Sequence, residues 1–87
     1  MVSKKLTVVN SQGLHARPAS VLSKEASLCP CDVKIQVGER VIEVKSILNI
    51  MVAAIKCGTE IELFCDGEKE EECLEKLSNL IESGLGD

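Results

Sequence analysis

The only histidine of the chain lies in a segment whose composition suits phosphate chemistry. The segment spans residues 13–20, Gly-Leu-His-Ala-Arg-Pro-Ala-Ser. An imidazole offers an unprotonated nitrogen near neutral pH, and a phosphoryl group bound to that nitrogen is passed on readily. Pro18 has a preset φ and no N–H, which suits the first turn of a helix. The unpaired N–H groups of such a turn stabilise an anion, so we expect His15 to handle phosphate at the start of a helix.

A lone histidine is most often structural, and three features favour a functional role for His15. It follows a Gly-Leu turn, it precedes the expected helix start, and its neighbour Arg17 has no nearby acid to pair with. The planar, permanently charged guanidinium of Arg17 suits phosphate oxygens, and the N–H groups near Ala16 and Arg17 are the expected cradle. No serine, cysteine or aspartate forms an evident triad with His15, so covalent carriage fits better than hydrolysis. Carriage requires an accessible ring.

A second candidate site is Ser46, which stands at an expected helix N-cap before the apolar segment 47–55. An ordinary cap is the simplest interpretation. However, the apolar side chains that follow exceed what one short helix buries, and we expect Ile47, Leu48 and Met51 to form a docking patch for a protein partner. A phosphate on the cap would stabilise the helix and place about two negative charges on that patch, so docking would weaken.

The composition bounds the class of protein. The 87 residues form one domain, 1–87, with an aliphatic core, because the chain has a single aromatic residue, Phe64. A net charge of −4 and the lack of stacking aromatics argue against direct nucleic-acid binding. No apolar run is long enough for membrane insertion and no signal peptide is evident, so we expect a cytoplasmic protein. We also expect it to be a monomer. Lys24, with Lys45 and Arg40, is a candidate contact for an acidic partner.

The chain has five cysteines, an odd number that makes a poor disulfide framework without a secretory signal. We therefore expect reduced thiols, several of them acting as small core hydrophobes. The pair Cys29-Pro-Cys31 does not have the spacing of a zinc knuckle, and His15 is needed elsewhere. We expect neither a metal nor a cofactor. The cysteines are Cys29, Cys31, Cys57, Cys65 and Cys73.

Hydrophobic periodicity predicts the elements that position these residues. Gly38-Glu39 predicts a two-residue type II′ turn between two strands. The element order is β-α-β-β-α-β-α, an α+β fold with helices on one face of a mostly antiparallel sheet. Strands are expected at 4–9, 32–37, 40–44 and 60–66, and helices at 16–28, at 47–55 and from the acidic opening 68–72 to Gly84.

The same patterns predict which helix faces are buried. Ala19, Leu22 and Ala26 are expected to face the core in the first helix, and a stripe of Leu74, Leu77 and Leu80 or Ile81 in the last. The solvent face of the first helix is expected to carry Ser20, Ser23, Lys24 and Ser27.

Residues 13–20 resemble the active-site signature of the HPr family, the histidine-containing phosphocarriers of the bacterial phosphoenolpyruvate:sugar phosphotransferase system. Residues 45–54, Lys-Ser-Ile-Leu-Asn-Ile-Met-Val-Ala-Ala, resemble the second signature of that family, around a regulatory serine. The two signatures have the family's separation, and the likeness covers essentially the whole chain. It implies an open-faced β-sandwich with three helices on one face of a four-stranded antiparallel sheet.

The resemblance also implies roles. His15 would take phosphate on Nδ1 from phosphorylated Enzyme I and give it to the IIA domains of sugar permeases, while Arg17 holds the phosphoryl oxygens. Ser46 would be the target of HPr kinase/phosphorylase, and the serine-phosphorylated form would serve a catabolite-control transcription factor as corepressor. The family's docking patch would comprise Ser20, Lys24, Ile47, Leu48 and Met51. Asn49 and Ala54 depart from the family pattern, because many members have glycine there.

Three functions remain open from the sequence. The first is a phosphocarrier, which is an intermediate between enzymes and has no turnover of its own. The second is a regulatory binding module of the same fold that acts mainly through Ser46, although the presence of both His15 and Arg17 disfavours it. The third is a carrier in another phosphorelay, although the Ser46 signature favours the sugar system.

Overall fold

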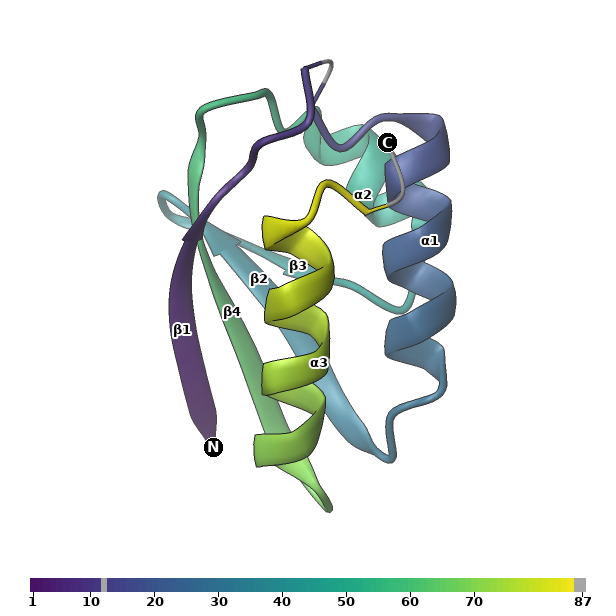
Figure 1. Ribbon diagram of the computed structural model, residues 1–87, viewed down its shortest axis with the longest axis vertical. Helices are drawn as coiled ribbons and strands as arrows, with labels where there is room; N and C mark the ends of the chain where they lie inside the picture. The colour runs from purple at the N-terminus through teal and green to yellow at the C-terminus, as the bar shows by residue number, and fades with distance from the viewer. Residues whose placement is uncertain (12, 86–87) are drawn as a thin grey trace.

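A computed structural model describes residues 1–11 and 13–85. It confirms the predicted order β-α-β-β-α-β-α, and Figure 1 shows the helices gathered on one face of a single sheet. No helix in these two ranges is long and apolar enough to cross a bilayer. The elements are β1 (Val2–Thr7), α1 (Ala16–Ser27), β2 (Cys31–Val37), β3 (Arg40–Glu43), α2 (Ile47–Ala53), β4 (Glu60–Gly67) and α3 (Glu70–Glu82).

The four strands form one antiparallel sheet in the order β1-β4-β2-β3. In the central pair, Ile35 of β2 lies opposite Leu63 of β4, and Leu6 of β1 lies opposite Ile61. All four side chains point to the helical face and are buried. The predicted fold class, three helices over a four-stranded antiparallel sheet, is confirmed.

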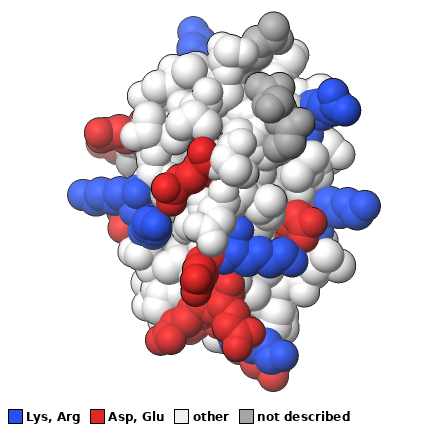
Figure 2. Space-filling model, viewed as in Figure 1, with Lys and Arg blue, Asp and Glu red and all other residues white. Residues whose placement is uncertain are grey.

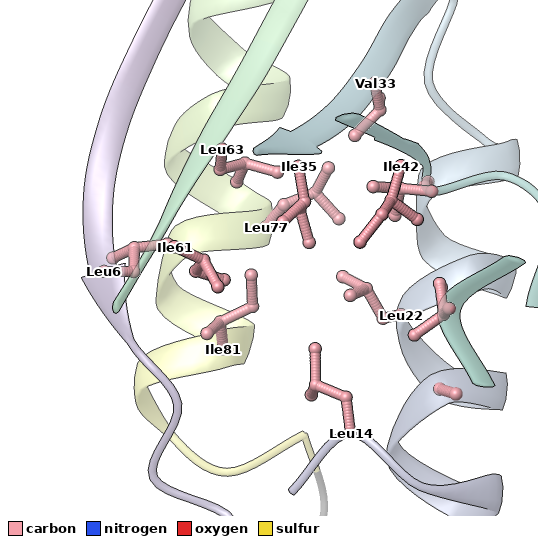
Figure 3. Packing of buried hydrophobic residues seen from close by; sticks show 14 of the residues in the cluster. Leu6, Leu14, Leu22, Val33, Ile35, Ile42, Ile61, Leu63, Leu77 and Ile81 are labelled. Carbon is pink, nitrogen blue, oxygen red and sulfur yellow. The ribbon is translucent and has the colours of Figure 1, made fainter. Parts of the chain in front are cut away.

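The core between the sheet and the helices is aliphatic, as expected from the composition (Figure 3). Ala19, Leu22 and Ala26 of α1 are fully buried, which confirms the predicted face of that helix. In α3 the predicted stripe is only partly right. Its centre runs through Cys73, Leu77 and Ile81, while the leucines at positions 74 and 80 lie half-buried on either side.

The β2–β3 turn has the predicted geometry. Val37 pairs with Arg40, so the loop consists of Gly38 and Glu39 alone. Gly38 has φ +59°, and Glu39 keeps a negative φ. A positive φ at only the first central position is the mark of a type II′ turn, and the glycine there adopts it without steric cost.

Helix α2 is two residues shorter than predicted. It ends at Ala53, because Ala54 adopts the left-handed conformation with φ 52° and ψ 48° and donates its N–H to the carbonyl of Met51. Ile55 then turns away into the core, where it is buried. Burial of this one side chain outweighs continuation of the helix, and periodicity alone does not reveal that competition.

Candidate functional site

His15 lies immediately before α1, at the N-cap position, with extended backbone angles of φ −89° and ψ −160°. Its carbonyl accepts the N–H of Ala19 at 2.8 Å, the first hydrogen bond of the helix. Its imidazole makes no capping hydrogen bond, and the residue is exposed. The ring is therefore accessible to a partner protein, which is what carriage of a phosphoryl group requires.

The first turn of α1 presents its amide groups beside His15. The first N–H that donates within the helix is that of Ala19, and Pro18 has no N–H. The N–H groups of Ala16 and Arg17 come before it and therefore lie at the open end of the helix. The N–H groups at the open end of a helix, with the positive end of its dipole, attract an anion. Arg17 is exposed and takes no part in the ion pairs found among residues 1–11 and 13–85. Backbone and side chain together can therefore hold phosphate oxygens.

Negative charge gathers at the other end of the molecule. The first turn of α3 contains Glu70, Glu71 and Glu72, and Figure 2 shows acidic side chains clustered at the end where α3 begins. In Figure 1 the start of α1 lies at the opposite end. This acidic cluster therefore lies away from the candidate phosphate site.

The loop that leads into α1 is fixed against the segment after α2. Gly13 has φ +72°, and a Cβ there would collide with the carbonyl oxygen of Ile55 and with Cα of Lys56. The N–H of Leu14 donates to the same Ile55 carbonyl at 2.8 Å, and the Leu14 side chain is buried. A glycine for the close approach and a leucine for the core thus set the chain direction at His15, and Figure 3 shows Leu14 pointing into the core.

A second contact fixes the same loop from another direction. Asn10 is buried, and its Nδ2 donates to the carbonyl of Gly84, just after α3, at 2.6 Å. Asn10 was not among the predicted site residues, because its sequence position marks it only as the residue after the strand expected at 4–9. Asparagine in a turn is usually exposed, and its burial here depends on the C-terminal turn packing over it, which no local pattern reveals.

The predicted N-cap at Ser46 is confirmed. Ser46 is half-buried with φ −102° and ψ 112°, and its Oγ accepts the N–H of Asn49 at 3.3 Å. The hydroxyl lies at the start of α2, where a negative group would interact favourably with the unpaired N–H groups.

Helix α2 exposes an apolar surface next to Ser46. The predicted residues Ile47, Leu48 and Met51 are all exposed, and the structure adds Val52, which the prediction missed. We call these four residues the α2 patch. Their exposed fractions are 39% for Ile47, 66% for Leu48, 38% for Met51 and 70% for Val52. Four neighbouring apolar side chains exposed on one short helix are typical of a protein-docking site.

The expected polar contacts around this surface divide into two groups. Ser20 and Lys24 are exposed on α1, which packs against α2. Lys45 and Arg40, the other candidate contacts for an acidic partner, each donate a hydrogen bond to a backbone carbonyl. Nζ of Lys45 donates to the carbonyl of Cys29 at 3.2 Å, and Nη1 of Arg40 donates to that of Ala53, at the end of α2, at 3.3 Å.

All five cysteines are free thiols, as expected, and four of them are buried. Burial raises the pKa of the Cys65 thiol to about 12, and it also raises the pKa values of Cys31 and Cys73. A thiol held in its neutral form is a poor nucleophile and metal ligand. These side chains therefore act as core hydrophobes, whereas Cys57 is exposed.

Comparison with known proteins places the chain in one family. The family model described as the PTS HPr component phosphorylation site matches residues 2–83. The phosphocarrier protein HPr of Mycoplasma capricolum is 40% identical over 90% of this chain and 89% of its own length. The HPr-like protein Crh of Bacillus subtilis is 38% identical over 94% of this chain and 96% of its own. The crystal structure of HPr from Thermoanaerobacter tengcongensis superposes with a TM-score of 0.95 at 32% identity, covering 100% of this chain and 98% of that one.

Proposed function

Because the chain belongs to the HPr family of phosphotransferase-system phosphocarriers, we propose that it accepts a phosphoryl group on Nδ1 of His15 from phosphorylated Enzyme I and passes it to the IIA domains of sugar permeases. The observation that carries this proposal is the position of the imidazole. His15 is exposed at the N-cap position of α1, and its imidazole makes no capping hydrogen bond. Two protein partners can therefore reach the same ring in turn.

The transfer itself needs little machinery from this chain. The Nδ1 lone pair attacks the phosphorus of the donor, and the new N–P bond forms as the bond from phosphorus to the donor breaks. In the second step the acceptor attacks the phosphorus and the imidazole leaves. In both steps the N–H groups of Ala16 and Arg17 and the Arg17 guanidinium stabilise the negative charge on the phosphoryl oxygens. The chain emerges unchanged and has no turnover of its own.

The α2 patch is the proposed docking surface for Enzyme I and the IIA domains, with Ser20 and Lys24 on the neighbouring face of α1. An apolar centre with polar neighbours has the composition of a transient interface. We propose that the protein acts in the cytoplasm, where the other components of the phosphotransferase system would meet it, and that each monomer presents its own His15. Light scattering of the purified chain checks this expectation, and a stable dimer would contradict it.

Phosphorylation of Ser46 by HPr kinase/phosphorylase is the proposed regulatory step. Ser46 accepts the Asn49 N–H at the start of α2, so a phosphate there would interact favourably with the helix end and leave the fold intact. About two negative charges beside the α2 patch would weaken its contacts with the carrier's partners. The modified surface would instead suit a catabolite-control transcription factor.

The carrier function is tested by incubating the chain with Enzyme I and labelled phosphoenolpyruvate. We expect acid-labile label on the intact chain, transfer of that label to an added IIA domain, and no label on His15→Ala. Arg17→Ala should fold normally and become labelled more slowly, because a charged hydrogen-bond donor to the phosphate is lost. An intact chain that stays unlabelled beside an active Enzyme I would refute the proposal.

A regulatory module is the second candidate, and the likeness to the HPr-like protein Crh together with the Ser46 cap favours it. This function needs Ser46 and does not need His15. Labelling with ATP and HPr kinase/phosphorylase should give acid-stable phosphate that is lost in Ser46→Ala and retained in His15→Ala. If the chain takes this label and none from Enzyme I, the regulatory function replaces the carrier function.

A further inference from the structure

Asn10 joins the loop before His15 to the distant end of the chain. Its side chain is 2% exposed, and its Nδ2 donates to the Gly84 carbonyl at 2.6 Å, across 74 residues of sequence. Its own carbonyl accepts the N–H of Gly13 at 2.9 Å. Since Gly13 stands two positions before His15, one buried residue contacts both the C-terminal turn and the last turn of chain before the imidazole.

The Gly84 carbonyl is a fixed acceptor because the turn after α3 is itself anchored. The N–H of Gly84 donates to the Ile81 carbonyl at 3.2 Å, and the N–H of Leu85 donates to the Leu80 carbonyl at 2.9 Å. Leu85 has φ +52°, an unfavourable conformation for a residue with a Cβ, and its side chain is buried. Burial of Leu85 and these two hydrogen bonds offset that cost, so Asn10 hydrogen-bonds to an anchored turn.

The two sides of the loop are therefore held by different parts of the fold. On one side Gly13 and Leu14 lie against Ile55, through a close backbone approach and a hydrogen bond. On the other side the Asn10 amide is bonded to Gly84, at the turn that lies near the start of α1 in Figure 1. Without the second contact the loop would be held from one side only.

We propose that Asn10 is a positioning residue for phosphoryl transfer, an inference that rests on the proposed function of His15. It acts through Gly13 by fixing the direction in which the chain enters α1. That direction sets where the imidazole stands relative to the N–H groups of Ala16 and Arg17. Donors stabilise a developing charge well only when they are oriented before the reaction begins, and a small misplacement is costly in rate.

The test compares Asn10→Ala with Val33→Ala. Val33 is fully buried, and Figure 3 places it at the opposite side of the core from Leu14. Its truncation lowers stability without touching the loop. With each variant as the substrate of Enzyme I, and at a temperature where both are folded, we expect kcat for Asn10→Ala to fall about tenfold with KM unchanged. Val33→Ala should keep both constants.

Unchanged kcat for Asn10→Ala, or an equal fall of kcat in Val33→Ala, would overturn the inference. If Asn10→Ala proves too unstable to fold, Asn10→Ser replaces it, because the serine hydroxyl is too short to reach as far as the amide yet preserves a buried polar group. For that variant we expect a smaller but measurable fall in kcat at unchanged KM. No change in kcat would count against the inference in the same way.

A second measurement separates this inference from the carrier function. Potassium phosphoramidate can phosphorylate an exposed imidazole without Enzyme I, and the amide resonances of Ala16 and Arg17 then report on the phosphate. We expect these resonances to shift in the intact chain, and to shift less in Asn10→Ala. Equal shifts in both proteins refute the positioning role even when Enzyme I labels the chain. Failure of Enzyme I to label the intact chain refutes the carrier function instead, and the shifts still test Asn10.

Discussion

The hydroxyl of Ser23 donates a hydrogen bond of 2.9 Å to the carbonyl of Lys45. This bond ties α1, the helix that begins after His15, to the residue directly before Ser46. Lys45 strengthens the same junction, because its Nζ donates to the carbonyl of Cys29, just beyond α1. Two hydrogen bonds of Lys45 therefore join the helix that follows His15 to the residue that precedes Ser46. One is accepted by the Lys45 carbonyl and the other is donated by its Nζ.

Replacing Ser23 by alanine should lower the free energy of unfolding by about 1 kcal/mol, because a partly buried carbonyl loses its hydrogen-bond donor. Urea denaturation at neutral pH measures the difference. Ser20→Ala is the matched control, since Ser20 is exposed on the same helix. A loss no larger than that of the control would show that the Ser23 bond contributes nothing to stability.

Ala54→Gly should raise the free energy of unfolding by about 1 kcal/mol, because a left-handed conformation is unfavourable for alanine and free of strain for glycine. The neighbouring change Ala53→Gly should have the opposite sign, since Ala53 is the last, buried residue of α2. Thermal denaturation of the two variants checks both signs. If both glycines destabilise the protein, the conformation at Ala54 carries no strain.

Ser46→Ala should destabilise the protein by about 1 kcal/mol, because the Asn49 N–H loses its capping acceptor. Ser46→Asp keeps an acceptor at the cap and should remain close to the native stability. The aspartate should nevertheless slow labelling by Enzyme I, because it places a negative charge beside the α2 patch. Both variants are compared by denaturation and by initial labelling rate. Equal labelling rates in all three proteins would argue against a regulatory role of charge at this position.

Glu70 should contribute to the pH dependence of stability. The Gly67 N–H donates to its carboxylate at 3.1 Å and the Met1 amine lies 3.1 Å away, and these two partners hold the Glu70 pKa below its usual 4.5. A folded-state pKa below the unfolded one means that the carboxylate stabilises the folded protein above pH 4.5, and that this contribution is lost as the pH falls through the lowered pKa.

Glu70→Gln should therefore be less stable than the native chain near neutral pH, and the difference should shrink on acidification. Melting temperatures measured between about pH 2 and about pH 7 reveal this convergence. Glu75→Gln, at an exposed position of the same helix, is the control and should leave the shape of the profile unchanged. A constant difference between the Glu70 variant and the native chain across the range would contradict the assignment.

The thiols should react in two classes. Cys57 is exposed and should be alkylated first by iodoacetamide, whereas the four buried thiols should be protected while the protein is folded. For Cys65 the raised pKa, about 12, adds to this protection because little thiolate exists near neutral pH. Mass spectrometry should find one rapid modification in the native chain and none in Cys57→Ser. Two or more rapid modifications would show that the core opens enough to expose at least one of the four buried thiols.

Most strands and helices were predictable because their periodicity is local, although the first strand, expected at 4–9, runs from Val2 to Thr7. Ile61, Leu63 and Cys65 recur at every second position and lie on the buried face of β4. Ala19 and Leu22 recur at helical spacing, and both face the core from α1. The position of His15 before a helix, and the cap at Ser46, followed from residue types within a few positions of each.

The errors arose where a distant segment decides the environment. Ser23 was expected on the solvent face of the first helix, and it is buried with its hydroxyl bonded to the carbonyl of Lys45. Helix α2 was expected to reach Ile55, whose burial in the core ends the helix at Ala53. In each case a contact between segments far apart in sequence outweighs the local preference.

The order of residues along this chain by itself determined the alternation of apolar and polar positions, and hence the element order, the buried faces and the placement of an imidazole at a helix start. Only the tertiary structure decided which backbone groups hold that imidazole in position. The bond from Asn10 to Gly84 spans 74 residues, and the contact of Gly13 with Ile55 depends on how the sheet and helices close around the core. Such contacts form between groups that no local pattern brings together, because their partners are chosen by packing of the whole chain.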